Sequence, residues 1–278
     1  MINILLCGNR GVLDGMITVI LSALMRNRKD TPYRFYIFTM DVSYINEGYI
    51  PITDADAAFL DRLSKGYNPE NSVIRIDVTA IYQRELGGCP NEGAYCSPYT
   101  LIRLLADLVP DMPDKLLYLD ADLLFNRDPN EIYGIDVCQY EYAAAPDHYG
   151  KYLISPGYIN AGVILFNLAQ AKRTGLFEKA RALLRKKKLP FADQSALIRA
   201  TKRRKLLKQK FNDQRLLHPH TVIRHFSKRM FYLPYPHTDN VKPWQTDRVH
   251  RVLRYHEFDD IFKEYKRLKK ELESEKEI

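Results

Sequence analysis

The sequence has few of the features that mark secreted disulfide-rich proteins or membrane-spanning proteins. Its 278 residues include four cysteines and one tryptophan, and no two cysteines form a CxxC pair. The best candidate for a membrane span, GMITVILSALM at 15–25, is shorter than the roughly 20 apolar residues that a transmembrane helix needs. The apolar start INILLC lacks the basic region of a secretory signal. These absences argue against a disulfide framework and a bilayer span, and they predict a cytoplasmic protein with reduced thiols.

Acidic residues are scarce between Lys172 and Lys210. This segment contains fifteen lysines and arginines but only Glu178 and Asp193 as acids, whereas the whole chain has a formal net charge of +8. A basic face of this kind suits anionic lipid headgroups, acidic glycans or nucleic acid, and the alternative is a pair of solvated helices with long cationic side chains. No helix-turn-helix, RRM or zinc signature accompanies the charge, so we expect no nucleic-acid partner.

The periodicity of the apolar residues predicts strands that alternate with helices. Strands are expected at 2–7, 33–40, 72–78 and 115–125, and helices at 14–28, 53–63, 97–108, 174–188, 193–203 and from 258. Asp14 is expected as the N-cap of the first helix, and Thr53 with Asp56 as a capping box for the second. The alternation is typical of βαβ crossovers and predicts an α/β fold with a mostly parallel sheet. Residues 1–257 are expected to form one domain, and 258–278 a charged C-terminal helix with a frayed end.

Two aspartates lie in the apolar run KLLYLDADLLF at 115–125. Residues two positions apart in a strand point to the same face, so the carboxylates of Asp120 and Asp122 can meet just beyond the strand's end. Open parallel sheets bind ligands at that edge, where the GNRG turn at 8–11 is also expected. Buried carboxylates need a cation, an arginine or a histidine as partner. The pair makes a partial site for Mg²⁺ or Mn²⁺ that leaves room for phosphates, although DxD pairs also occur by chance.

Four other motifs place polar residues in apolar or helical surroundings. Arg103 lies on the predicted helix before the DAD strand, where a surface arginine is the alternative. His225 ends an apolar stretch, and it is either structural or a third metal ligand that would favour Mn²⁺. Asp193 and Gln194 begin a helix, for which Asp193 alternatively serves only as the N-cap. In VKPW, Lys242 can offer an ammonium to a phosphate, or the turn can simply fill the core.

The ordered set of these motifs resembles glycosyltransferase family 8 over about residues 2–245. The matching segments, in order, are YTLIRL, LYLDADLLF, YINAGVILFNL, ADQSAL, IRHF and KPW. The resemblance implies a GT-A fold, in which helices flank a central mixed, mostly parallel sheet. It also implies a retaining hexosyltransferase that uses Mn²⁺ or Mg²⁺ and moves glucose or galactose from a UDP-sugar to a glycan or lipid-linked acceptor, in lipopolysaccharide or capsule biosynthesis.

The resemblance also implies roles for individual residues. The implied metal ligands are Asp120, Asp122 and His225. The implied donor contacts, besides the metal ligands Asp120 and Asp122, are Cys7, Gly8, Asn9, Arg103, Ala121, Asn160, Ala161 and Lys242. Asp193 would hold hydroxyls of the donor sugar, and Gln194 would lie nearest to its anomeric carbon.

The chain departs from the family pattern at two places. GNRG replaces an acid pair after the first strand, so Asn9 is expected to offer a carbonyl oxygen to the base instead. Residues 227–241 separate the histidine from KPW, which makes Lys228 an alternative to Lys242 for the diphosphate. The inserted segment is alternatively part of an acceptor wall, through its aromatic residues Phe231, Tyr232 and Tyr235.

Other functions remain open from the sequence. A phosphohydrolase of the haloacid dehalogenase type also carries DxD after a strand, but it places Thr or Val where this chain has Leu124. A self-glycosylating initiator would use one of the nineteen tyrosines. For a transferase with a lipid-linked acceptor, the basic segment and the terminal helix are expected to contact an anionic inner leaflet peripherally.

Overall fold

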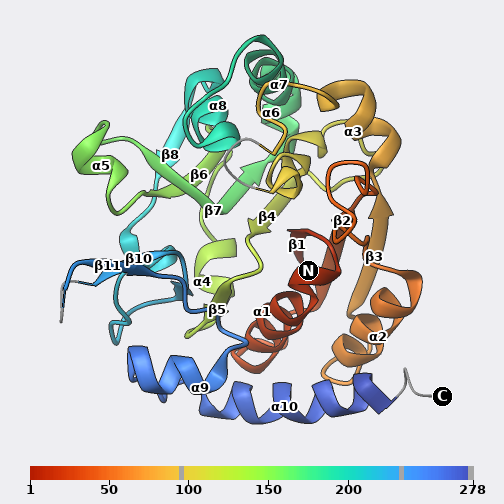
Figure 1. Cartoon of the computed structure of the whole chain (residues 1–278), viewed down its shortest axis with the longest axis vertical. Coiled ribbons are helices and arrows are strands. Elements are labelled where there is room, and N and C mark those ends of the chain that lie inside the picture. Colours follow the sequence, from red (N-terminus) through yellow and green to blue (C-terminus); the bar gives the residue numbers. More distant parts are fainter. Residues whose placement is uncertain (94–96, 232–234, 275–278) are drawn as a thin grey trace.

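The computed structural model describes residues 1–93, 97–231 and 235–274, and its centre is one seven-stranded sheet (Figure 1). The strands are β1 (Ile2–Cys7), β2 (Tyr33–Thr39), β3 (Ser72–Asp77), β4 (Lys115–Leu119), β6 (Tyr142–Pro146), β7 (Ile159–Asn167) and β8 (Arg204–Leu206). Their order across the sheet is β3-β2-β1-β4-β7-β6-β8. Strand β7 runs antiparallel to its neighbours β4 and β6, and the other pairs are parallel. The prediction of a mixed, mostly parallel sheet is confirmed.

Helices cover both faces of this sheet (Figure 1). One face carries α1 (Leu13–Met25), α2 (Asp54–Lys65) and α10 (Asp259–Ser274), and the other carries α3 (Thr79–Leu86), α6 (Leu168–Thr174), α7 (Leu176–Lys186) and α8 (Ala192–Ala200). Successive strand residues point to opposite faces, so Ile4 and Leu6 of β1 pack with the first group and Leu5 packs with the second. No helix in the described ranges combines the length and the apolar content that crossing a bilayer needs.

Two small strand pairs lie outside the main sheet. Strand β5 (Leu123–Phe125) pairs antiparallel with β9 (Ile223–His225), and β10 (Arg229–Phe231) pairs antiparallel with β11 (His237–Asp239). The second pair is the segment inserted before KPW, and Tyr232 of that segment lies outside the described residues. The remaining helical turns are η1 (Arg10–Val12), η2 (Pro98–Thr100), η3 (Ile102–Leu105), α4 (Asn130–Tyr133), α5 (Gly150–Leu153), η4 (Gln209–Phe211), α9 (Thr246–Arg248) and the π-helical η5 (Val249–Leu253).

The starts of α1 and α2 show one wrong and one correct capping prediction. The 3₁₀ turn η1 runs directly into α1, so Asp14 lies in the first turn of α1 and is not its N-cap. The Asp14 carboxylate instead accepts a hydrogen bond from Lys269 of α10 (2.6 Å). At α2, the Thr53 N–H donates to Asp56 (3.0 Å) and the Asp56 N–H donates to the Thr53 hydroxyl (3.1 Å), which confirms the capping box.

The segment predicted as a helix at 97–108 forms the two 3₁₀ turns η2 and η3 instead. The Arg103 guanidinium donates to the carbonyl of Thr100 (2.8 Å), which is the acceptor that Leu104 would use in an α-helix. The Leu104 N–H bonds to Leu101 (3.0 Å), one residue nearer. The 3₁₀ geometry at Leu104 thus occurs together with the contact of the Arg103 side chain to Thr100, and no local sequence pattern predicts that contact.

The basic segment is less uniform than its composition suggests. The helix predicted at 174–188 is α7, and Gly175, with a positive φ of 68°, separates it from α6, which was not predicted. Arg181 of α7 is 2% exposed, and its guanidinium lies 2.5 Å from Asp107 and 3.1 Å from Glu178. Asp107, from outside the segment, and Glu178, from within it, therefore compensate part of the positive charge.

The C-terminal helix α10 lies beside α1 (Figure 1), and its apolar face packs against the core. Its buried apolar residues, including the residue just before the helix, are Phe258, Ile261, Phe262, Tyr265, Leu268 and Leu272. They recur every three or four residues, as one stripe of a helix requires. At the start of α10, both carboxylate oxygens of Asp260 accept hydrogen bonds from Arg26 of α1 (2.6 and 2.9 Å). The predicted helix is confirmed, and a separate unit from residue 258 stays a prediction.

Replacing Ile261 with alanine should lower the free energy of unfolding by about 2–4 kcal/mol, because this side chain is fully buried and its truncation leaves a cavity. The change Lys263→Ala, on the exposed side of the same helix, should leave stability nearly unchanged. Urea unfolding followed by circular dichroism measures both variants. If the two changes had the same small effect, α10 would not be part of the cooperative core.

Candidate functional site

The polar residues predicted from the sequence gather at the carboxyl end of β4. Asp120 directly follows β4 and Asp122 directly precedes β5, so a single turn carries both carboxylates. The pairing of β5 with β9 places Leu123 opposite His225. The Phe226 N–H also donates to the carbonyl of Asp122 (2.9 Å). The register of a three-residue strand pair therefore brings the histidine to the two aspartates.

Asp120, Asp122 and His225 form a group of possible metal ligands. One ligand atom from each lies within 4.8 Å of the others. His225 Nε2 is 3.2 Å from Asp122 Oδ1 and 3.9 Å from Asp120 Oδ2. Burial opposes the ionisation of Asp122, but His225 and the ammonium of Lys242 outweigh it, so the pKa of this carboxyl lies well below its usual range. The Asp122 carboxylate is thus ionised near neutral pH and suited to hold a cation.

A chain of hydrogen bonds orients the His225 ring. Its Nδ1 lies 3.0 Å from the side-chain oxygen of Asn212, whose amide nitrogen donates to Asn160 Oδ1 (2.9 Å). The Asn160 amide nitrogen in turn donates to Asp147 (3.0 Å). This order places a proton on Nδ1, so Nε2, which faces the aspartates, is the nitrogen available to a metal, which is the usual arrangement of a metal-binding histidine.

Strand β7 passes next to the three ligands at Gly162. A Cβ at this position would lie 2.4 Å from His225 Cε1 and 2.8 Å from Asp120 Oδ2. The carbonyl of Gly162 also accepts a hydrogen bond from the Asp120 N–H (2.8 Å). Any side chain here would displace the ligands, so the close approach of the strand requires glycine.

Arg103 connects the aspartates to the interior of the fold. Its side chain is 3% exposed, its Nη2 lies 3.2 Å from Asp120 Oδ1 and its Nε lies 3.3 Å from Asp193 Oδ2. The guanidinium also donates to the carbonyl of Ala161 (2.5 Å) and lies 4.0 Å from the centre of the Tyr118 ring. The alternative of a surface arginine is therefore wrong.

Asp193 lies in the first turn of α8 and does not cap the helix, so the N-cap alternative is also wrong. The two preceding residues, Phe191 and Ala192, have positive φ values of 54° and 34°, a conformation that is uncommon outside glycine and often marks functional sites. Burial, only partly offset by the charge of Arg103, raises the pKa of the Asp193 carboxyl to about 6. Asp193 Oδ2 is buried and accepts no hydrogen bond from the described residues.

Gln194 faces the same stretch of β7 as Arg103. Its side-chain oxygen accepts a hydrogen bond from the Ala161 N–H (3.0 Å), while the Ala161 carbonyl binds Arg103. The predicted residues Asn160, Ala161, Asp193 and Gln194 therefore lie together, on one side of the metal-ligand group.

Lys242 reaches the group in spite of the inserted segment. Its Nζ lies 2.5 Å from Asp122 Oδ2, whereas Lys228 is exposed. Nearby, Trp244 and the carbonyl of Ala121 pack against α1 at Gly15, where a Cβ would lie 2.6 and 2.4 Å from them. The KPW turn thus supplies both a cation to the site and an aromatic contact to α1.

The turn after β1 lies beside the site because β1 and β4 are neighbours in the sheet. Cys7, like Cys89 and Cys138, has a free thiol, and burial raises the pKa of Cys7 well above its ordinary value. The Gly8 N–H bonds to the carbonyl of Phe38 (3.0 Å). The side-chain oxygen of Asn9 accepts from the Gly11 N–H (3.1 Å), so this oxygen already stabilises η1. Cys96 lies outside the described residues.

Several residues that build the site were not singled out from the sequence. They are Tyr118, which donates to Asp120 (2.5 Å), and Asp147, Gly162 and Asn212. Tyr118 and Asp147 could have been identified as site candidates by their position, since each lies near the carboxyl end of a strand of the main sheet. No sequence pattern identifies Asn212, because its partner His225 is thirteen residues away along the chain.

Comparison with known proteins finds relatives that are named glycosyltransferases. The chain is 28% identical over 197 residues to glycosyltransferase GlyA of Streptococcus pneumoniae serotype 4 (strain ATCC BAA-334 / TIGR4), an alignment that covers 70% of this chain and 25% of GlyA. A second curated relative, from Haemophilus influenzae (strain ATCC 51907 / DSM 11121 / KW20 / Rd), is 26% identical over 164 residues. That alignment covers 55% of this chain and 45% of the relative, so the chain spans less than half the length of both.

Solved structures share the whole fold. The galactosyltransferase LgtC, in complex with donor and acceptor sugar analogues, superposes with a TM-score of 0.68 at 18% identity, covering 96% of this chain and 95% of LgtC. The bifunctional glycosyltransferase WbbM superposes with a TM-score of 0.67 at 19% identity, covering 95% of this chain and 49% of WbbM. These similarities confirm the predicted GT-A fold. The family model for glycosyl transferase family 8 matches residues 3–248, and the chain therefore belongs to glycosyl transferase family 8.

Proposed function

We propose that this protein transfers glucose or galactose from a UDP-sugar to a hydroxyl of a glycan or glycolipid acceptor, with retention of configuration, in lipopolysaccharide or capsule biosynthesis. The observation that carries the proposal is the convergence of Asp120, Asp122 and His225 at the carboxyl end of β4. Membership of family 8 supports glycosyl transfer as the reaction class and argues against a phosphohydrolase. The sugar, the nucleotide and the pathway rest on the family resemblance.

The metal-ligand group suits Mn²⁺, with Mg²⁺ as the alternative. Two carboxylates and an imidazole form the mixed oxygen and nitrogen set that transition metals accept. The Asp120 side chain is 29% exposed, so the group is open to a ligand. When bound, a divalent cation supplies positive charge that stabilises a departing diphosphate. Lys242, beside Asp122, is positioned to add a second positive charge.

Asp193 and Gln194 are suited to the sugar side of the donor. Oδ2 of Asp193 pairs with the Arg103 guanidinium but accepts no hydrogen bond from the described residues, so it can accept one from a sugar hydroxyl, since buried acceptors are normally satisfied. The side-chain oxygen of Gln194 accepts a hydrogen bond from the Ala161 N–H. In LgtC, a solved active-site mutant has a glutamine replaced by glutamate, so that protein also has a glutamine in its active site. Arg103 pairs with both Asp120 and Asp193 and is therefore suited to hold these carboxylates in place. Direct contact between Arg103 and the donor stays a prediction.

Retention of configuration is proposed to follow from attack on the face that the leaving group occupies. The bond between the anomeric carbon and the diphosphate oxygen breaks, the acceptor oxygen forms the new bond, and its proton passes to the departing diphosphate. A covalent intermediate would need a nucleophile, and an amide such as Gln194 is a poor one. Asp193 is the alternative nucleophile, and isolation of a glycosyl adduct on either residue would contradict front-face attack.

Incubation of the purified protein with a panel of nucleotide sugars should release nucleoside diphosphate from UDP-glucose or UDP-galactose only when Mn²⁺ or Mg²⁺ is present. The change Asp122→Asn should slow this hydrolysis about 10²–10³-fold, because it weakens the electrostatic stabilisation of the leaving group. Chromatography of the released nucleotide measures both rates. Hydrolysis that needs no metal, or that survives Asp122→Asn, would contradict the proposal, and a hexose-sized mass gain on the protein would indicate a self-glycosylating initiator.

The change Gly162→Ala should weaken Mn²⁺ binding at least about tenfold, because the new methyl group would displace His225 and Asp120. Electron paramagnetic resonance of free Mn²⁺ gives the affinity, and circular dichroism shows whether the fold persists. Gly48→Ala is the matched control, because Gly48 is far from Gly162 in the sequence and a Cβ added there would meet only the Asn46 side chain. If a folded Gly162→Ala protein bound Mn²⁺ with unchanged affinity, Mn²⁺ would not bind at this cluster.

We also propose that the cationic residues of α7 and its C-terminal end hold the enzyme at an anionic leaflet. Lys186, Lys187 and Lys188 are exposed at this end. Vesicles that contain phosphatidylserine should sediment the protein at low salt and release it as salt rises, and alanine at all three lysines should weaken the binding. Equal sedimentation with neutral vesicles would refute the membrane contact.

A further inference from the structure

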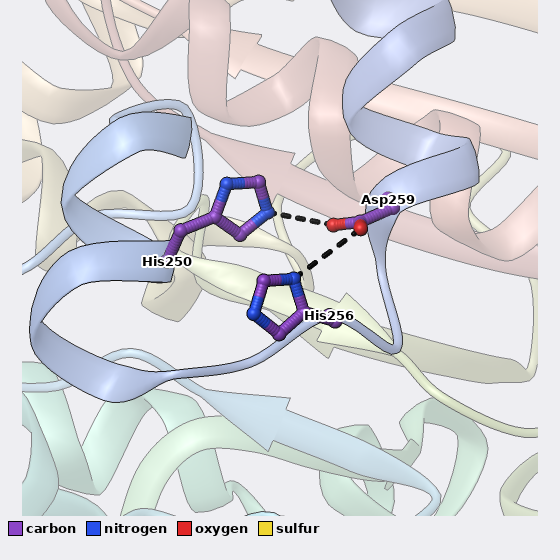
Figure 2. A group of neighbouring side chains, drawn as sticks. All are labelled: His250, His256 and Asp259. Carbon is purple, nitrogen blue, oxygen red and sulfur yellow. Dashed lines mark hydrogen bonds and ion pairs between the residues drawn. The ribbon is translucent and has the colours of Figure 1, made fainter.

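A second group of possible metal ligands lies on the surface, where η5 meets the start of α10. It consists of His250, His256 and Asp259, and one ligand atom from each lies within 4.8 Å of the others (Figure 2). His250 comes from the π-helical η5, His256 from the following loop and Asp259 from the first turn of α10. The group is separate from the Asp120 cluster and takes no part in the proposed transfer reaction.

Both imidazoles direct a ring nitrogen toward the Asp259 carboxylate (Figure 2). His250 Nε2 lies 2.6 Å from Asp259 Oδ1, and His256 Nδ1 lies 3.4 Å from Asp259 Oδ2. The imidazole rings stack with their centres 4.8 Å apart and an angle of 15° between their planes. Phe262 of α10 packs edge-on against the His250 ring (5.7 Å), which holds that ring in place.

Asp259 is the carboxylate that the two rings share. Its Oδ1 lies beside the His250 ring and its Oδ2 beside the His256 ring. The nearby acids have other partners, since Asp260 pairs with Arg26 through both oxygens and Asp247 pairs with Lys266 (3.2 Å). One carboxylate and two imidazole nitrogens therefore lie close enough together to share a cation.

We propose that His250, His256 and Asp259 form a transition-metal site that binds Zn²⁺. Two imidazoles and one carboxylate match the three protein ligands of an open zinc site, with water in the fourth position. At zinc–ligand distances of about 2.0–2.2 Å, tetrahedral ligands lie about 3.3 Å apart. The contact between His256 and Asp259 already has this spacing, and the contact between His250 and Asp259 needs to widen by less than about 1 Å.

The ion would link η5 to the start of α10, which are joined in the chain by a loop. η5 follows the turn that carries Lys242 and Trp244, and α10 packs against α1. Arg254, at the end of η5, has a positive φ of 58°. A bound ion would therefore restrain the path from the KPW turn to the terminal helix, so zinc should stabilise the folded protein beyond its effect at the Asp120 cluster.

Zinc titration of the full chain by isothermal calorimetry at about pH 7.5, where an ordinary imidazole is mainly neutral, tests the site. The wild type should bind two equivalents of Zn²⁺, one at each cluster, and the double variant His250→Asn/His256→Asn should bind one. Asp259→Asn, which keeps both rings, should also lose the second equivalent or weaken it at least about tenfold. Lys263→Ala, at an exposed position of α10, should keep both.

The melting temperature provides an independent readout. Zinc should raise it by several degrees more in the wild type than in the double variant, because only the wild type has the second site. Circular dichroism without zinc establishes that each variant is folded. If the wild type and the folded variants bind the same number of zinc ions, or gain the same thermal stability, the cluster is only a hydrogen-bonded pair of histidines and the proposal is wrong.

Discussion

The arrangement of the site depends on the compensation of two carboxylates at the end of β4. Asp120 and Asp122 are separated by one residue and lie at a mostly apolar sheet edge, so their charges require nearby positive groups. Arg103 compensates Asp120 from inside the fold, and His225 and Lys242 compensate Asp122 from the C-terminal part of the chain. Each partner comes from a different region, so the pair of aspartates draws three distant segments to one point.

Strand β7 is the second element on which this arrangement depends. Its antiparallel course beside β4 lets the backbone of Ala161 hold both Arg103, through the carbonyl, and Gln194, through the N–H. One residue further, Gly162 allows the strand to pass close to Asp120 and His225. The stretch Asn160 to Gly162 therefore sets the spacing between the proposed metal and sugar halves of the site.

Local patterns predicted the elements that depend on local contacts. The capping box at Thr53 and the short apolar runs of β1 and β2 were sufficient to predict their elements. The DAD motif correctly placed two carboxylates at the sheet edge, but the single strand expected at 115–125 is wrong, because a turn that carries both aspartates separates β4 from β5. The helix at 97–108 failed because the Arg103 side chain takes a backbone acceptor there, and Asp14 failed as a cap because η1 precedes α1. The support of His225 by Asn212 arises only from tertiary packing, so no sequence period reports it.

We propose above all that Asp120, Asp122 and His225 bind a divalent cation that also contacts the diphosphate of a sugar nucleotide. A crystal structure with Mn²⁺ and UDP, measured at a wavelength where manganese scatters anomalously, would show whether they do. We expect an anomalous peak in contact with all three side chains and with both phosphate groups of UDP. An anomalous map that is empty between these side chains while UDP is bound, or a diphosphate that lies elsewhere on the protein, would show that the cluster does not hold the donor through a metal.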